Sequence, residues 1–221
     1  MFDLEKYIRE LTTSLKRIFG ERLLYVGLQG SYLRNEADEN SDVDIMVIID
    51  NITVKDLDEY RKAIISVGYF EKSCGFICGK SEMANWNPLE VCHLIHTTKN
   101  IHGNLTEFLP MYTEEDEKNF IKYSVGNIYH EICHRYIHSD RDKNIINLPF
   151  TYKSLFYLLQ NLYYLEHGIF IATKRELNEH LSNEDKEVME LAMKLKENID
   201  YDFDYAFGKL FTWCQKVLSR V

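Results

Sequence analysis

The sequence predicts an α+β protein in which a small mixed-sheet domain, residues 1–108, is followed by an all-α helical bundle, residues 109–221. Three observations support this fold class. Aliphatic and β-branched runs in the first part follow the order strand, strand, helix, strand. From Thr113 onward, apolar residues recur at helical spacing. The chain is long enough for two small domains, and its 45% hydrophobic content is sufficient for packed cores.

The first part opens with a helix and two strands. Apolar positions at helical spacing over residues 3–19 predict an amphipathic helix that ends at Gly20. The run of residues 23–28 is typical of a buried strand, and residues 43–49 form a second run rich in β-branched side chains. A polar loop, residues 31–41, separates the two strands.

A crossover is expected next. Thr53 followed by Asp56 predicts a capped helix over residues 54–67, and a third strand is expected within residues 70–78. Two strands joined through one helix in the same sheet run parallel. The third strand should therefore lie parallel to the strand of residues 43–49.

Helix-start signals recur along the second part of the chain. Thr113, followed by four acidic residues, predicts a long helix that ends near His138, and residues 139–149 are expected to form a polar connector. Further helices are expected from Thr151 to Gly168, after Thr173 with Glu176, after Ser182 with Asp185, and over residues 203–218.

Charge and cysteine content restrict the class of partner. The formal net charge is −9, so a nucleic acid is an unlikely partner and a cationic small molecule is better suited. The five cysteines form no CxxC pair, which indicates reduced thiols and a cytoplasmic location. No apolar run approaches the length of a membrane span, so no membrane association is expected. The sequence leaves both a monomer and a homodimer open.

The candidate functional residues are Gly30, Ser31, Asp42 and Asp44. A glycine at the end of a strand lets the backbone turn and approach a ligand, and the serine adds a hydroxyl and an N–H for a phosphate. Asp42 and Asp44 are two residues apart on one strand, so their carboxylates point to the same side. Two such carboxylates are a suitable hard-oxygen site for Mg²⁺.

Each of these features also has a plain structural explanation, since Gly-Ser is a common turn and paired aspartates are common in solvated loops. Asp44, however, lies inside an otherwise apolar strand. A carboxylate there is costly unless it is paired or bound to a metal. The combination therefore favours a functional site.

The Gly30-Ser31 turn followed by Asp42-x-Asp44 resembles the polymerase-β-type nucleotidyltransferase superfamily over residues 22–50. Residues 154–168, followed by Ala172-Thr-Lys-Arg-Glu, are similar to the C-terminal helical domain of aminoglycoside adenylyltransferases of the streptomycin/spectinomycin type. The resemblance implies that Asp42 and Asp44 bind Mg²⁺. It also implies that Gly30 and Ser31 hold the phosphates of a nucleoside triphosphate, with Arg34 as a further phosphate contact.

The reaction implied by the resemblance transfers a nucleoside monophosphate, AMP from ATP, to a hydroxyl of a small, aminoglycoside-like acceptor. The family also uses a third carboxylate on the next core strand, as metal ligand or general base. Glu71 is the only acid placed near the start of that strand, and the strand centre has none. Glu82 and Glu90 are later candidates.

Two alternatives stay open. The first is a nucleotidyltransferase-like regulatory or toxin–antitoxin module that modifies or binds a protein. The second is a zinc hydrolase, because His130-Glu131-Ile132-Cys133-His134 matches HExxH on a predicted helix. No further ligand signature follows that motif, so three histidines on one helix face, including His138, are the favoured interpretation.

Overall fold

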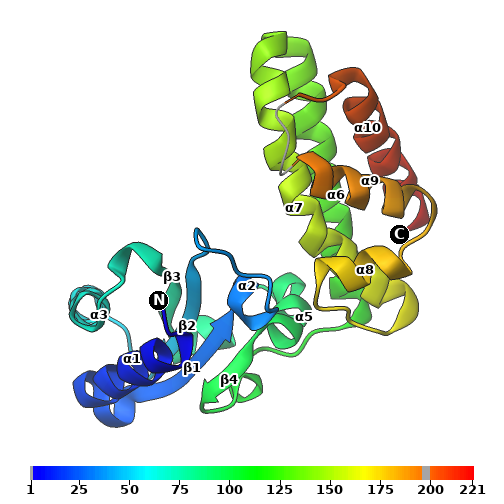
Figure 1. Ribbon diagram of the computed structural model, residues 1–221. Coiled ribbons are helices and arrows are strands. Elements are labelled where there is room, and N and C mark those ends of the chain that lie inside the picture. Colours follow the sequence, from blue (N-terminus) through cyan, green and yellow to red (C-terminus); the bar gives the residue numbers. More distant parts are fainter. Residues whose placement is uncertain (1, 196–199) are drawn as a thin grey trace. The chain divides into compact units, whose positions relative to one another are not determined.

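The computed structural model describes residues 2–195 and 200–221 and divides the chain into two compact units, with the break after Met111 (Figure 1). The first unit has a mixed sheet, and the second is helical. The predicted α+β class is confirmed. None of the helices in the described parts of the chain is both long and apolar enough to cross a membrane.

A four-stranded sheet in the order β3-β2-β1-β4 forms the centre of the first unit. Its strands are β1 (Leu23–Gln29), β2 (Val43–Ile49), β3 (Ser73–Gly79) and β4 (Lys99–His102). The central pair β1–β2 is antiparallel, as is β1–β4, whereas β2–β3 is parallel. The predicted parallel crossover is therefore confirmed.

The two faces of the sheet carry different layers. Helices α1 (Leu4–Phe19) and α3 (Val54–Val67) pack on the face that receives Val43, Ile45 and the other odd-numbered residues of β2. Met46 and Ile48 point to the opposite face. There they form a cluster with Met83 of α4 (Lys80–Ala84). Leu94 of α5 (Pro88–Thr97) packs against the same cluster.

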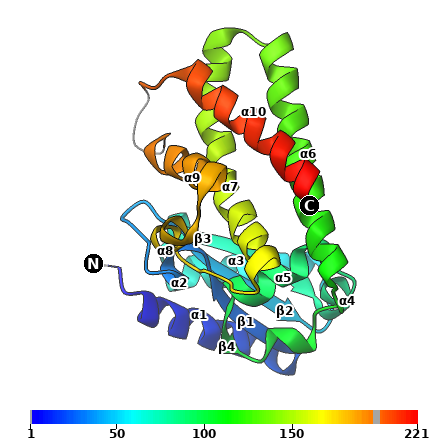
Figure 2. The same ribbon diagram turned by 90° about the vertical axis from the view of Figure 1, so that its right-hand side faces the viewer.

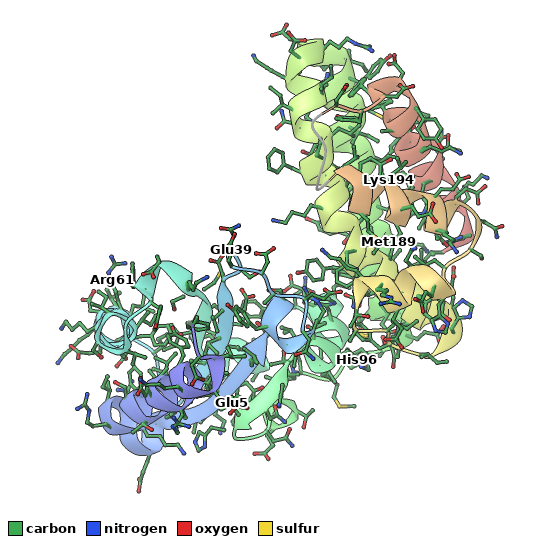
Figure 3. The ribbon with its side chains drawn as sticks, in the orientation of Figure 1. Glu5, Glu39, Arg61, His96, Met189 and Lys194 are labelled. Atoms are coloured by element: carbon green, nitrogen blue, oxygen red, sulfur yellow. The ribbon has the colours of Figure 1, made fainter. Side chains whose placement is uncertain are left out.

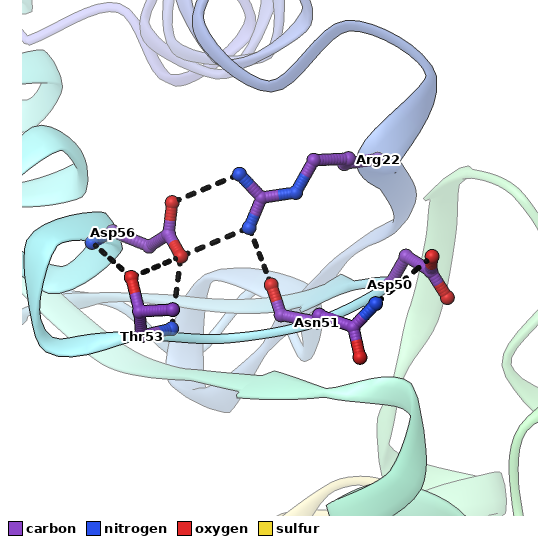
Figure 4. Close-up of polar contacts among 5 residues, drawn as sticks. All are labelled: Arg22, Asp50, Asn51, Thr53 and Asp56. Carbon is purple, nitrogen blue, oxygen red and sulfur yellow. Dashed lines mark hydrogen bonds and ion pairs between the residues drawn. The ribbon is translucent and has the colours of Figure 1, made fainter.

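The start of α3 is fixed by a polar network that is drawn in Figure 4. Thr53 and Asp56 form the predicted capping box. The Asp56 carboxylate also accepts two hydrogen bonds from the guanidinium of Arg22, at 2.9 and 3.1 Å. Arg22 donates in addition to the carbonyl of Asn51. The network joins the segment before β1 to the turn after β2.

One boundary in this unit differs from the prediction. The third strand was expected within residues 70–78, but Phe70–Lys72 form a 3₁₀ turn and β3 begins at Ser73. Tyr69, just before the turn, has φ +58°, which bends the chain sharply after α3. Glu71 therefore lies on the turn and not on the strand.

In the described residues of the second unit, five helices surround one core. Figure 2 shows their arrangement. They are α6 (Glu114–His138), α7 (Arg141–His167), α8 (Lys174–His180), α9 (Asn183–Leu195) and α10 (Phe203–Arg220). The Thr113 capping box and the Thr173 cap are both present. Leu155, Leu159 and Trp213 are almost fully buried at the centre.

The expected polar connector over residues 139–149 is wrong, because α7 begins at Arg141 and continues through Pro149. A proline inside a helix has no N–H for the carbonyl four residues earlier, which here belongs to Ile145. The hydroxyl of Tyr201 donates to that carbonyl at 2.6 Å. The helix continues because a distant side chain replaces the missing donor, which local sequence does not reveal.

Two other expected capping residues have different roles, although α9 begins directly after Ser182 as expected. Thr151 was expected to cap a helix, but it is buried within α7, where its hydroxyl accepts from Arg135. Asp185 was expected to close a capping box with Ser182. Its carboxylate instead accepts hydrogen bonds from the indole of Trp213 and the guanidinium of Arg220. Tertiary contacts take precedence over local capping at both positions.

Candidate active site

The pairing of β1 with β2 brings the two parts of the predicted site together. Gln29, the last residue of β1, is opposite Asp44 in the antiparallel register. Gly30 follows at once and begins the four-residue helix α2 (Gly30–Leu33), which also contains Ser31. The loop after α2 returns the chain to Asp42, directly before β2. Residues more than ten positions apart in sequence thus share one corner of the sheet.

Gly30 lies in contact with Asp44 in a way that only glycine permits. Its φ is +73°, a backbone conformation that other residues rarely adopt. A methyl group on Gly30 would also overlap Oδ2 of Asp44. The glycine is needed both for the turn and for the space beside the carboxylate.

Asp42 and Asp44 differ in their exposure to solvent. Asp42 is exposed at the end of the loop, and Asp44 is half-buried on the sheet face of Met46. Burial raises the pKa of Asp44 and the neighbouring Asp42 carboxylate raises it further, against the opposing effects of the Cys74 thiol and the Arg34 charge. A half-buried carboxylate next to a second one is favourable when a cation lies between them.

The residue opposite Asp44 on the parallel strand β3 is Cys74. Its thiol acts as a hydrogen-bond donor toward the carboxylate of Asp44, and burial raises the pKa of this thiol. Strand β3 itself, Ser73–Gly79, contains no carboxylate. Asp44 is the second residue of β2, and Cys74 is the second residue of β3. With the third strand expected to begin at Phe70, its second residue would have been Glu71, so the sequence did not indicate Cys74.

The structure also places the remaining predicted residues. Arg34 follows α2, is well shielded from solvent, and its Nε donates to Glu36 at 2.9 Å. Its charge lowers the pKa of Asp44, so the guanidinium lies within electrostatic reach of the site. Glu71 is exposed on the 3₁₀ turn before β3. Glu90 accepts a hydrogen bond from the indole of Trp86, which stacks on Phe76.

The carboxylate oxygens at this corner suit a Mg²⁺ ion that is also bound by phosphate oxygens. Asp42 and Asp44 offer hard carboxylate oxygens, and Mg²⁺ in phosphate-transfer sites is commonly held by one or two carboxylates together with substrate phosphates. Within residues 2–195 and 200–221, no three histidine, cysteine, aspartate or glutamate side chains are grouped closely enough to hold a metal by themselves. The two aspartates fit a metal that arrives with its nucleotide.

A comparison with protein-family models decides the class of this unit. Residues 8–74 match the model described as the nucleotidyltransferase domain. The first unit contains a nucleotidyltransferase domain. The match includes most of α1, the Gly30 turn, both aspartates and Cys74, so these residues of the site all lie within the matched region. A search of curated proteins finds no relative that matches the chain.

The fold of the whole chain is similar to a solved enzyme structure. The spectinomycin adenyltransferase AAD(9) from Enterococcus faecialis, crystallised with ATP and spectinomycin, matches with a TM-score of 0.63. The match covers 99% of this chain and 100% of that chain at 16% sequence identity. At this identity the likeness establishes a shared fold, which extends from the nucleotidyltransferase domain through the helical unit.

The HExxH motif of the second unit lies on α6. His130, His134 and His138 follow one another along the helix, with ring centroids 6.2 and 4.8 Å apart. Glu131, the base in a zinc hydrolase of this type, forms an ion pair with Arg135 at 2.9 Å. No group of three potential metal ligands includes these histidines in the part of the chain that the structure describes.

Proposed function

We propose that this protein transfers a nucleoside monophosphate, AMP from ATP, to a hydroxyl of a small acceptor with the help of Mg²⁺. The observation that carries the proposal is the contact of Gly30 with Asp44 beside Asp42 in a nucleotidyltransferase domain. It joins a backbone turn that suits a phosphate to a pair of carboxylates that suits the accompanying cation.

In this proposal each residue has a defined task. The backbone and hydroxyl of Ser31 bind the outer phosphates of the nucleotide, and Gly30 lets the chain approach them without a side chain in the way. Asp42 and Asp44 hold Mg²⁺, which when bound neutralises charge on the reacting phosphates. Arg34 adds a positive charge near the same corner. The acceptor hydroxyl attacks the α-phosphorus, and pyrophosphate leaves.

The acceptor class rests on two observations. The chain carries a formal net charge of −9, which favours a cationic small molecule over a polyanion. The solved structure of similar fold was crystallised with ATP and spectinomycin. An aminoglycoside-like molecule combines a positive charge with hydroxyl nucleophiles. We therefore propose this class as the acceptor. We also propose that the enzyme is cytoplasmic and binds both the nucleotide and the acceptor.

The test is pyrophosphate release from ATP and Mg²⁺ in the presence of a panel of aminoglycosides that includes spectinomycin. We expect Asp42→Asn with Asp44→Asn to abolish release and to weaken binding of Mg-ATP at least tenfold. A matched double variant, Asp58→Asn with Asp142→Asn, makes the same charge change at exposed positions and should behave as the original protein.

Two results would change the assignment. Undiminished Mg-ATP binding in the Asp42/Asp44 double variant would show that the nucleotide binds elsewhere. Label transferred from α-labelled ATP to a protein, with none on any aminoglycoside, would instead favour a module that modifies a protein. Metal analysis of the purified protein tests the HExxH alternative, because one bound zinc per chain is required for hydrolysis by that motif.

A further inference from the structure

The first unit contains a cavity whose lining does not include Gly30, Asp42 or Asp44. Its volume is about 620 Å³, within the range of about 300–1,000 Å³ that is usual for sites of small ligands. One wall is a continuous stripe of α1 from Leu4 to Lys16, which spans roughly 18 Å at the helical rise. Leu28 of β1 and Ile101 of β4 line the cavity from the sheet.

This cavity lies on the opposite face of the sheet from the candidate active site. Leu28 belongs to the core cluster under α1, whereas Asp44 has the orientation of Met46 and Ile48 on the other face. The cavity is therefore separate from the nucleotide corner, although Tyr32 of α2 contributes to its lining.

The charges around the cavity are unusual for such an acidic chain. Arg9 and Lys16 on α1 and Lys99 on β4 line it, and all three are exposed. None of the three belongs to an ion pair within the described residues, whereas Lys6 on the same helix pairs with Glu10. Glu5, which projects from α1 in Figure 3, is the one acidic residue in the lining. The surroundings thus carry an excess of positive charge while the chain carries −9.

We propose that this cavity, bounded by α1, α2 and β4, binds an organic anion that carries a carboxylate, phosphate or sulfonate on an apolar body. The anionic group lies among Arg9, Lys16 and Lys99, and the apolar body covers Leu28 and Ile101. The cations attract the charge without an ion pair that would first have to break. The aliphatic residues bury the rest of the ligand.

The test is a fluorescence titration of the full chain with anilinonaphthalene sulfonate, an aromatic organic anion. We expect saturable binding of one molecule per chain, unaffected by saturating Mg-ATP. The triple variant Arg9→Glu, Lys16→Glu, Lys99→Glu should bind at least tenfold more weakly. A control triple variant, Lys55→Glu, Lys80→Glu, Lys122→Glu, makes the same change of charge at exposed positions outside the cavity and should bind normally.

Milder variants keep the test valid if the triple variant does not fold. Lys99→Gln and Lys16→Gln each remove one exposed charge from the lining of the cavity. Both should weaken binding several-fold with an unchanged circular dichroism spectrum. The proposal is overturned if no saturable binding occurs, if both triple variants bind alike, if Lys99→Gln and Lys16→Gln bind normally, or if Mg-ATP displaces the probe. None of these outcomes depends on whether the protein transfers nucleotides.

Discussion

Gly30 and Asp44 are in direct contact, and the missing side chain of the glycine is the space that the carboxylate of Asp44 occupies. The antiparallel register sets this relationship, because Gln29 is opposite Asp44 and Gly30 follows it. The turn and the acidic strand are therefore a single structural unit. A change at Gly30 acts on the carboxylate as well as on the backbone.

Gly30→Ala tests this coupling. The left-handed φ of +73° costs about 1–2 kcal/mol for a residue with a side chain, and the new methyl group displaces the carboxylate of Asp44. We expect a lower melting temperature and at least tenfold weaker Mg-ATP binding, measured by calorimetry.

Gly68→Ala is the matched control for that variant. Gly68 also has a positive φ, +89°, but a methyl group there meets no atom within 4 Å. It should lower the melting temperature of the same unit without changing the affinity for Mg-ATP. Equal losses of affinity in both variants would show that backbone strain alone, and not the contact with Asp44, explains the effect.

Cys74→Glu tests the place opposite Asp44 on β3. The variant sets a third carboxylate beside Asp42 and Asp44, where three negative charges repel one another until a cation binds. We expect Mg²⁺ affinity to rise about tenfold, equivalent to about 1.4 kcal/mol. Thermal unfolding with and without Mg²⁺ measures this, since the ion should stabilise the variant more than the original protein.

Cys74→Ser is the control that separates the effect of the added negative charge from the effect of removing the thiol. The serine hydroxyl still donates to Asp44 but adds no charge, so the effect of Mg²⁺ on the melting temperature should stay at its original value. If Cys74→Glu and Cys74→Ser respond alike to Mg²⁺, the side chain at position 74 does not face the metal site.

Sequence predicted those elements whose local signals agree with their tertiary surroundings. The strand of residues 43–49 is such a case, because its apolar residues pack on both faces of the sheet. Strand ends and side-chain alternation placed Gly30 after one strand and Asp44 on the next, but it is the antiparallel register of the structure that brings the two together. Cys74 was missed because the start of β3 depends on the left-handed Tyr69, which no pattern signals. The course of α7 through Pro149 depends on Tyr201, more than 50 residues away.

Asp56→Asn tests the network that holds the start of α3. Hydrogen bonding from Arg22 lowers the pKa of Asp56 to about 2, with Thr53 adding to the effect. Because the pKa of Asp56 is lower in the folded protein, its ionised carboxylate stabilises the fold fully at pH values above its usual pKa of 3.8. This contribution is lost as the pH falls towards 2. The variant should therefore be less stable at neutral pH, and the difference should vanish near pH 2.

Urea titrations of the original protein and Asp56→Asn at several pH values measure this difference. Asp58→Asn, on the exposed side of the same helix, serves as the control and should show little pH-dependent difference. A stability difference for Asp56→Asn that stays constant from pH 7 to pH 2 would contradict the ionic origin of the effect and indicate a loss of packing or capping alone.

Tyr201→Phe tests the replacement of the hydrogen bond that Pro149 removes from α7. Without the hydroxyl, the Ile145 carbonyl loses its donor, which should lower the free energy of unfolding by about 1–2 kcal/mol. In a Pro149→Ala background the alanine N–H donates to Ile145, so the same substitution should cost about 1 kcal/mol less. Chemical denaturation of the four proteins gives this coupling energy. Additive effects would mean that Tyr201 stabilises the unit through packing and does not replace the missing N–H.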